Sequence, residues 1–200
     1  MIMPPLILAS ASPARRRLLE NVGLVVQIQP SHFDESQIQD PDPRQLVARL
    51  AQAKAEVVAH QTRPPALILG CDSVLEMGGV VYGKPASLSA ARQQWQRMRG
   101  QVGYLHTGHA LVDLNRRQWL VQTETTEVHF ASPTDAQIDA YIATGEPLAC
   151  AGAFALEGRG SLWIRHLVGT PSNVIGLSVP LLAQMLQSLG WDITQAWPAD

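Results

Sequence analysis

One carboxylate, Asp72, stands in a segment that otherwise predicts a buried strand. From Ala66 to Leu75 the chain is apolar except for this aspartate and the serine that follows it. A buried carboxylate is costly unless it binds a metal ion, pairs with a cation or takes part in acid–base chemistry. Asp72 is therefore the leading candidate for a catalytic residue. The alternative is a structural pair between Asp72 and a lysine.

Two lysines stand where they could reach a carboxylate or a bound anion. Lys84 lies in the loop Gly83–Pro85, and a tight turn at Gly78-Gly79 would return it close to the strand of Asp72. Lys54 falls in the middle of the apolar stripe of a predicted helix, where lysine is rare without a partner. We expect Lys54 to reach phosphate oxygens or a carboxylate, although its stem could instead extend to the surface.

A helix start directly after the first predicted strand could bind an anion. Ser12 suits the N-cap and Pro13 suits the first helical position, which leaves free N–H groups facing outward. The run Arg15–Arg17 is unusual there, because the helix dipole costs a cation roughly 0.3–1 kcal/mol. A bound polyanion would explain the run, with Arg15 the strongest candidate. The alternative is that these arginines are solvated and point away from the helix axis.

Polar residues in loops and one histidine pair form a weaker group of candidates. Asp34 and Glu35 could supply a second carboxylate for a divalent cation, or could simply form a solvated turn. Glu157, in a glycine-bounded loop, could read a base or a ribose, or simply close a turn. His106 and His109 lie on a predicted strand, where their spacing places them on opposite faces. We interpret both as structural or surface histidines.

The elements that must position these residues alternate between strands and helices. Strands are expected over Pro5–Ala9, Leu24–Ile28, Ala66–Met77, Val80–Tyr82, Tyr104–Leu114, Trp119–Phe130, Ala153–Leu156 and Leu162–Leu167. Helices are expected over Pro13–Asn21, Pro43–His60, Ser89–Arg99, Thr134–Thr144 and Pro180–Leu189, with a loop over Gly169–Gly176. The pattern predicts a mixed α/β fold with a curved sheet.

Composition and missing motifs exclude several other classes. The chain has 200 residues, 46% of them hydrophobic, which is enough for a sizeable core. Only 16% are charged and the net charge is −2, so we expect no binding to a nucleic-acid polymer. We expect no membrane association and a cytoplasmic location, because no apolar stretch spans a bilayer and the N-terminus lacks a signal peptide. The charge-poor surface is compatible with a homodimer. P-loop and dinucleotide-binding enzymes are excluded, because their glycine motifs are absent from the sequence.

Several short motifs, in order along the chain, resemble those of the Maf family of nucleoside triphosphate pyrophosphatases. The motifs are Leu8–Arg15, Asp72-Ser73, Gly83–Pro85, Thr107-Gly108, Tyr141–Pro147, Ala151–Phe154 and Ser172–Leu177. No single motif is specific, but their joint order over nearly the whole chain makes a chance resemblance improbable.

The resemblance implies a fold, an activity and a cofactor. The fold would be α/β and similar to inosine triphosphate pyrophosphatases, with a mixed curved sheet, flanking helices and a cleft between two lobes of a single domain over residues 1–200. The activity would be house-cleaning hydrolysis of nucleoside triphosphates, canonical or modified, to the monophosphate and pyrophosphate. A divalent cation, Mg²⁺ or Mn²⁺, would assist it. The family has also been linked to arrest of septum formation in bacterial cell division.

Carried over position by position, the resemblance also assigns the site. Asp72 looks like the proton acceptor and, with Glu35, like a metal-binding residue. The positions that look like substrate-binding residues are Ser10, Arg15, Lys54, Ser73 and Lys84.

Two positions depart from the family pattern. Ala14 stands where the family often has the first of two arginines, so one phosphate contact is missing unless Arg16 supplies it. Ser73 replaces the common threonine and keeps the hydroxyl group.

The resemblance leaves the preferred base open. Many members that prefer pyrimidine nucleotides carry glutamine where this chain has Glu157, whereas a branch that prefers 7-methylguanosine triphosphate carries glutamate. An acid there could pair with a guanine edge or with the positive charge of a methylated purine. One alternative is therefore a pyrophosphatase specific for 7-methylguanosine triphosphate. The other is a non-catalytic nucleotide-binding regulator of cell division, which would have no need to retain Asp72 or Lys84.

Overall fold

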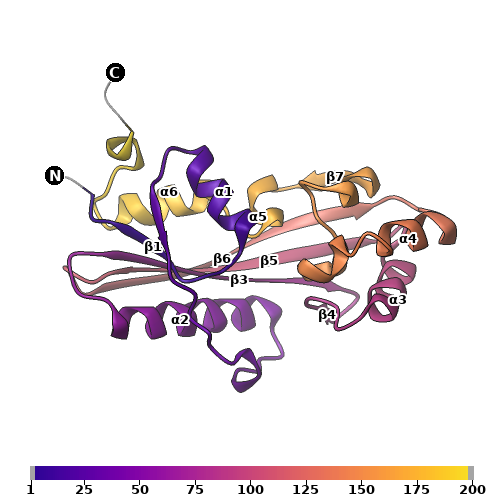
Figure 1. The fold of residues 1–200 in the computed structure, drawn as a ribbon, viewed down its shortest axis with the longest axis horizontal. Helices are drawn as coiled ribbons and strands as arrows, with labels where there is room; N and C mark the ends of the chain where they lie inside the picture. The colour runs from indigo at the N-terminus through magenta and orange to yellow at the C-terminus, as the bar shows by residue number, and fades with distance from the viewer. Residues whose placement is uncertain (1–2, 198–200) are drawn as a thin grey trace. The chain divides into compact units, whose positions relative to one another are not determined.

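The computed structural model describes residues 3–197, so both ends of the predicted 1–200 domain lie outside the described residues. A seven-stranded mixed sheet has the order β2-β1-β3-β5-β6-β7, with β4 paired to β3 (Figure 1). The strands are β1 (Leu6–Leu8), β2 (Val26–Ile28), β3 (Leu67–Met77), β4 (Val80–Tyr82), β5 (Val102–Asp113), β6 (Gln118–Phe130) and β7 (Ile164–Val168). The α-helices are α1 (Pro13–Asn21), α2 (Pro43–Gln61), α3 (Leu88–Met98), α4 (Asp135–Ile142), α5 (Pro171–Ile175) and α6 (Val179–Ser188). The predicted mixed α/β fold is confirmed.

The chain divides into two compact units. The first comprises residues 1–72, 107–124 and 176–200, and the second comprises residues 73–106 and 125–175. Strands β3, β5 and β6 contribute residues to both units. A single domain with a cleft between two lobes stays a prediction.

In the first unit, the short strand β1 forms the centre of a parallel arrangement. It pairs in parallel with β2 on one side and with β3 on the other, so that Ile7 lies opposite Gln27 and Ile68. All three residues of β1 are buried, which is the pattern of a parallel strand covered on both faces. Figure 1 shows α2 on one side of these strands and α1 and α6 on the other.

Helix α2 approaches the sheet closely because two glycines leave room for it. A Cβ atom at Gly70 of β3 would lie 2.2 Å from the carbonyl oxygen of Ala51, and one at Gly108 of β5 would lie 2.1 Å from that of Val47. A side chain at either position would therefore push the helix away. Because strand residues alternate between faces, Asp72 shares with Gly70 the face of β3 that α2 covers.

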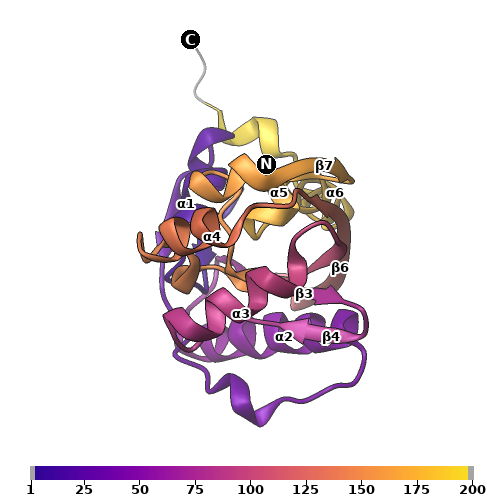
Figure 2. The same cartoon turned by 90° about the vertical axis from the view of Figure 1, so that its right-hand side faces the viewer.

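The core of the second unit is aromatic. Trp95 of α3 makes edge-on contacts with the rings of Phe130, Tyr141 and Trp163, at centroid distances of 5.9, 5.6 and 5.6 Å. Edge-on aromatic pairs add about 0.5–1.5 kcal/mol each to the burial of their surface. Helices α3 and α4 lie side by side (Figure 2), and Arg92 of α3 forms an ion pair with Asp139 of α4.

Most predicted elements are confirmed within two residues, but two are wrong. The expected strand Ala153–Leu156 is absent from the described structure, because Gly152 and Ala153 have positive φ angles of 72° and 58° and form a 3₁₀ turn instead. The expected loop Gly169–Gly176 contains the helix α5. Five helical residues are too few to show a helical period in the sequence.

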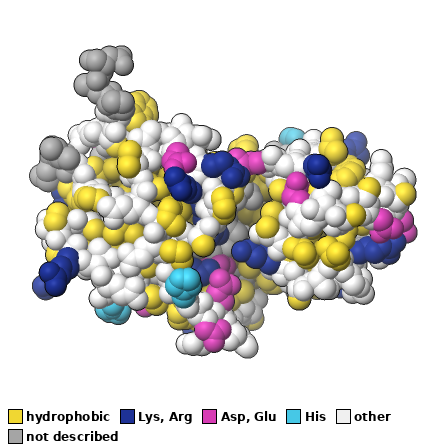
Figure 3. Space-filling model, in the orientation of Figure 1, with side chains coloured by type: hydrophobic (Ala, Val, Ile, Leu, Met, Phe, Trp, Pro, Cys, Tyr) yellow, Lys and Arg dark blue, Asp and Glu magenta, His cyan; other side chains and the backbone are white. Residues whose placement is uncertain are grey.

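The surface in view carries few charges. On the face that Figure 3 shows, lysine and arginine side chains of the described residues form small separate groups, several of them next to aspartate or glutamate. Between residues 3 and 197, no helix is both long enough and apolar enough to cross a membrane.

Candidate active site

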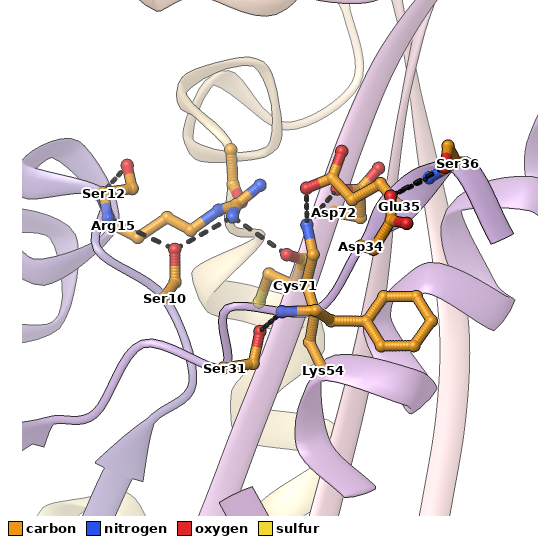
Figure 4. A network of polar contacts seen from close by, with 12 residues as sticks. Ser10, Ser12, Arg15, Ser31, Asp34, Glu35, Ser36, Lys54, Cys71 and Asp72 are labelled. Carbon is orange, nitrogen blue, oxygen red and sulfur yellow. Dashed lines mark hydrogen bonds and ion pairs between the residues drawn. The ribbon is translucent and has the colours of Figure 1, made fainter. Parts of the chain in front are cut away.

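In the first unit, the ammonium group of Lys54 contacts two other predicted site residues, Glu35 and Asp72 (Figure 4). Lys54 of α2 lies 2.6 Å from Oδ1 of Asp72 and 2.6 Å from Oε1 of Glu35. Lys54 and Asp72 are buried, with 9% and 7% of their surface exposed, whereas Glu35 is exposed. The lysine therefore links a buried carboxylate to one at the surface, which confirms that it reaches a carboxylate.

The packing of α2 explains how Lys54 reaches Asp72. Ala51 and Ala55 of the helix both lie against Gly70 of β3, so the two backbones are close at this point. Residues three apart on a helix share a face, which turns Lys54 toward the strand on which Ala51 packs. Asp72 is the next residue beyond Gly70 on that face of the strand.

The surroundings of Asp72 make its carboxylate a stronger base. Burial is the largest influence and raises the pKa of Asp72 above its ordinary value, and the nearby positive charges of Lys54 and Arg15 offset this only in part. A carboxylate with a raised pKa is better suited to accept a proton near neutral pH. The neighbouring Cys71 thiol is no competing nucleophile, because burial raises its pKa to about 11.

Arg15, in the first turn of α1, is held by backbone and side-chain acceptors. Its Nε donates to the carbonyl oxygen of Gly176 at 2.7 Å, and its Nη1 donates to the carbonyl oxygen of Cys71 at 2.9 Å and to Oγ of Ser10 at 3.2 Å. Ser12 caps the helix as predicted, its side chain accepting from the backbone N–H of Arg15. The guanidinium group is thereby fixed beside strand β3 (Figure 4).

The buried His109 forms a hydrogen bond with the segment whose Gly176 carbonyl accepts from Arg15. Nε2 of His109 accepts a hydrogen bond from the backbone N–H of Ser178 at 2.8 Å, two residues after Gly176. Burial, reinforced by the charge of Arg15, lowers the pKa of His109 to about 4, although a hydrogen bond with the Thr107 backbone opposes the shift. The ring is therefore neutral near pH 7 and remains an acceptor, in the structural role that the sequence predicted.

Arg16 occupies a different position from Arg15. It pairs with Glu20 one helical turn later, at 2.6 Å, on the exposed side of α1. The prediction that the arginines point into solvent therefore applies to Arg16 and not to Arg15. That Arg16 replaces the contact missing at Ala14 stays a prediction.

The remaining predicted site residues belong to the second unit. Ser73 on β3 is partly buried, and Lys84 and Glu157 are exposed. The predicted hairpin is confirmed, because Leu75 of β3 pairs with Tyr82 of β4, two residues before Lys84.

Several contacts at the site were not predicted from the sequence. Two acceptors of Arg15 are the backbone carbonyls of Cys71 and Gly176, and a carbonyl group leaves no mark in an amino-acid sequence. Asp34 accepts from the backbone N–H of Ser36 at 3.1 Å and so caps the short 3₁₀ helix Glu35–Gln37. An aspartate side chain often accepts from the backbone N–H two residues later, and this contact gives Asp34 the turn role that the sequence left open.

The carboxylates of Glu35 and Asp72 are hard oxygen donors of the kind that a divalent cation takes. Within residues 3–197, no group of three or more His, Cys, Asp or Glu side chains is placed to hold a metal ion. Mg²⁺ commonly takes only one or two carboxylates from a protein and its other ligands from phosphates and water. Two carboxylates on one ammonium group, at 2.6 Å each, provide such a pair of hard oxygen donors.

Residues 5–189 match the family model for Maf-like proteins, and the chain therefore belongs to the Maf family. A nucleoside triphosphate pyrophosphatase of Synechococcus elongatus is 59% identical over 198 residues, which cover 98% of this chain and 99% of that protein. One from Thermosynechococcus vestitus is 59% identical over 191 residues, 96% of each chain. A solved nucleoside-triphosphatase (dITP/XTP pyrophosphatase) from Mycobacterium abscessus is far more distant, with a TM-score of 0.44 and 15% identity over 64% of this chain and 74% of that one.

Proposed function

We propose that this protein hydrolyses nucleoside triphosphates to the monophosphate and pyrophosphate, with Asp72 as the proton acceptor. The observation that carries the proposal is the buried carboxylate of Asp72, held at 2.6 Å by Lys54 and close enough to Arg15 for that charge to affect its pKa. Relatives that bear the name of this activity match nearly the whole length of the chain.

The proposed reaction is in-line attack of water on the α-phosphorus, with pyrophosphate as the leaving group. Asp72 accepts the proton from the attacking water, and the oxygen of water becomes part of the monophosphate. Oδ1 of Asp72 already accepts from Lys54, so we assign the proton to Oδ2. Lys54 keeps the carboxylate oriented and opposes the rise of its pKa, so that a useful fraction stays ionised near neutral pH.

Positive charges and hydroxyl groups hold the triphosphate in this proposal. Arg15, Lys54 and Lys84 stabilise the charge that develops on the β- and γ-phosphates. Ser10 and Ser73 hold phosphate oxygens, together with the N–H groups at the start of α1. Arg15 is already oriented by three hydrogen bonds, which lowers the reorganisation needed on binding.

We assign Glu35 and Asp72 to the divalent cation, Mg²⁺ or Mn²⁺. When bound, the cation supplies charge neutralisation on the phosphates. Glu35 is the adaptable partner of the two, because it is exposed on a short 3₁₀ helix whereas Asp72 is fixed in β3.

Glu157 is proposed to read the base, with 7-methylguanosine triphosphate as one alternative substrate. A cytoplasmic house-cleaning role fits an enzyme that acts on free nucleotides, and a homodimer stays a prediction. The rival function is a non-catalytic regulator of cell division, in which Asp72 and Lys54 form only a structural pair; the raised pKa of Asp72 favours the proton acceptor instead.

Pyrophosphate release tests the proposal. Purified protein is mixed with canonical and modified nucleoside triphosphates and Mg²⁺ or Mn²⁺, with Asp72→Asn as the comparison and EDTA as the metal control. We expect release from a subset of the nucleotides, lost with EDTA and in the variant. Binding of nucleotide without release from any of them would support the regulator instead.

A further inference from the structure

The loop that carries Glu157 is fastened at both ends by two side chains of the second unit. The backbone N–H of Ala155, before Glu157, donates to the hydroxyl oxygen of Tyr141 at 3.2 Å. The N–H groups of Arg159 and Gly160, after it, donate to Oε2 and Oε1 of Glu146 at 3.1 and 3.0 Å. Glu157 therefore lies midway between two fixed points, two residues from each.

The two fastening side chains are themselves joined. The hydroxyl of Tyr141 donates to Oε1 of Glu146 at 2.8 Å, so one carboxylate accepts three hydrogen bonds. Burial alone would raise the pKa of Glu146, but the hydrogen bonds from Tyr141, Gly160 and Arg159 outweigh it, and the pKa is lowered. The carboxylate therefore stays ionised, and ionised acceptors form the stronger hydrogen bonds.

Packing makes this arrangement rigid. The ring of Tyr141 is 2% exposed and meets Trp95 and Trp163 edge-on at 5.6 and 5.2 Å, which fixes the position of its hydroxyl group. Two glycines allow the loop to lie against the fastening groups. A Cβ at Gly158 would lie 2.6 Å from Oε2 of Glu146, and one at Gly160 would lie 2.6 Å from the hydroxyl oxygen of Tyr141.

We propose that Glu146 and Tyr141 are positioning residues for nucleotide specificity, which fix the loop of residues 155–160 so that Glu157 is presented to the base in one orientation. The inference rests on the proposed function, in which Glu157 reads the base. Discrimination by hydrogen bonding depends on a reader held in place, because a mobile carboxylate adapts to several base edges. A purely structural role would leave discrimination between bases unchanged.

Glu146→Gln is the sharpest variant. Glutamine keeps the shape of glutamate and one side-chain oxygen, but an NH₂ group replaces the other oxygen. That NH₂ group is a donor, and it would face another donor, either a backbone N–H of the loop or the hydroxyl of Tyr141. Tyr141→Phe removes the hydroxyl and keeps the packed ring. Glu157→Gln measures how much discrimination the reader itself provides. Glu127→Gln is the matched control, because it removes a carboxylate charge elsewhere in the same unit, next to His129.

The first measurement is kcat/KM for pyrophosphate release with guanine, 7-methylguanine and pyrimidine nucleoside triphosphates. We expect Glu146→Gln to reduce the ratio between the best and worst substrates about tenfold, toward the ratio of Glu157→Gln. Tyr141→Phe should reduce it less, and Glu127→Gln should leave it unchanged. An unchanged ratio in Glu146→Gln, with a changed ratio in Glu157→Gln, would overturn the proposal.

Hydrogen exchange of backbone amides tests the loop without any reaction. Glu146→Gln should lower the protection of the Arg159 and Gly160 amides about tenfold, and Tyr141→Phe should do the same for Ala155. Equal protection in wild type and variants would overturn the fastening of the loop. A wild-type protein that releases no pyrophosphate would overturn the proposed function, and the exchange result would still decide whether the loop is fastened.

Discussion

The candidate catalytic cluster of the first unit and the Glu157 loop of the second unit are held in different ways. In the first, opposite charges meet, with Lys54 between Glu35 and Asp72. In the second, the carboxylate of Glu146 collects only neutral N–H and O–H donors. The difference suits the proposed tasks, because stabilising a triphosphate needs charge, whereas holding a loop needs directional hydrogen bonds that salt does not screen.

The largest expected effect comes from Asp72→Asn, which removes the proposed base and keeps its shape. We expect kcat to fall roughly 10³-fold, within the range of lost general-base catalysis, with little change in nucleotide affinity. Steady-state kinetics and equilibrium binding measure the two quantities. The control Glu56→Gln changes an exposed-side carboxylate of α2 that accepts a hydrogen bond from Gln52 at 2.8 Å. A wild-type rate in Asp72→Asn would show that Asp72 is not the proton acceptor.

Lys54→Met tests whether charge organises the first cluster. The ammonium group lowers the pKa of Asp72, so its loss should raise that pKa further and move the acid limb of kcat/KM to higher pH. An unpaired buried carboxylate should also cost about 3 kcal/mol in the free energy of unfolding. A pH–rate profile and urea unfolding measure both effects. Lys54→Arg keeps a cation and should shift the profile less, whereas an acid limb that stays in place would refute the role of Lys54.

His109→Gln tests how the stability of the first unit depends on pH. The pKa of His109 is about 4 in the fold against an ordinary 6.5 in the unfolded chain, so only the unfolded chain gains a proton between these values. The folded state should therefore lose roughly 3 kcal/mol of stability as the pH falls from 6.5 to 4. Glutamine still offers an acceptor to Ser178 but does not titrate. In urea unfolding, the free energy of unfolding of the variant should therefore change less with pH than that of the wild type. Parallel curves for both proteins would contradict this assignment.

The smallest expected effect distinguishes Arg16 from Arg15. Arg16→Ala removes an exposed ion pair with Glu20 and should cost less than about 0.5 kcal/mol, with kcat/KM nearly unchanged. Arg15→Ala should lower kcat/KM by about 10²-fold, because it removes a fixed charge at the proposed phosphate site. A large loss of kcat/KM in Arg16→Ala would mean that Arg16 supplies the contact missing at Ala14.

The first unit could be predicted well from the sequence because its features are local. Asp72 interrupts an apolar strand, Lys54 interrupts an apolar helix stripe, and Ser12-Pro13 begins a helix where the structure has one. Each is visible within a window of about ten residues. The pairing of Lys54 with Asp72 depends on the close approach of α2 at Gly70, and no local pattern indicates that contact.

The second unit could be predicted less well because its contacts depend on backbone geometry. The positive φ of Ala153 prevents the strand that the sequence predicts from this residue onward. The acceptors at Tyr141 and Glu146 bind backbone N–H groups of residues 155–160, more than ten residues away, and such donors exist at almost every position of a chain. The sequence therefore identified Glu157 as a candidate without any indication of what holds it.

The central claim is that Asp72 promotes attack of water on the α-phosphorus. Hydrolysis in ¹⁸O-labelled water, followed by mass spectrometry of both products, tests it most directly. The account predicts that the label enters the nucleoside monophosphate, at a rate that falls with Asp72→Asn. Label in the pyrophosphate or in free phosphate, or an unchanged rate in the variant, would contradict it.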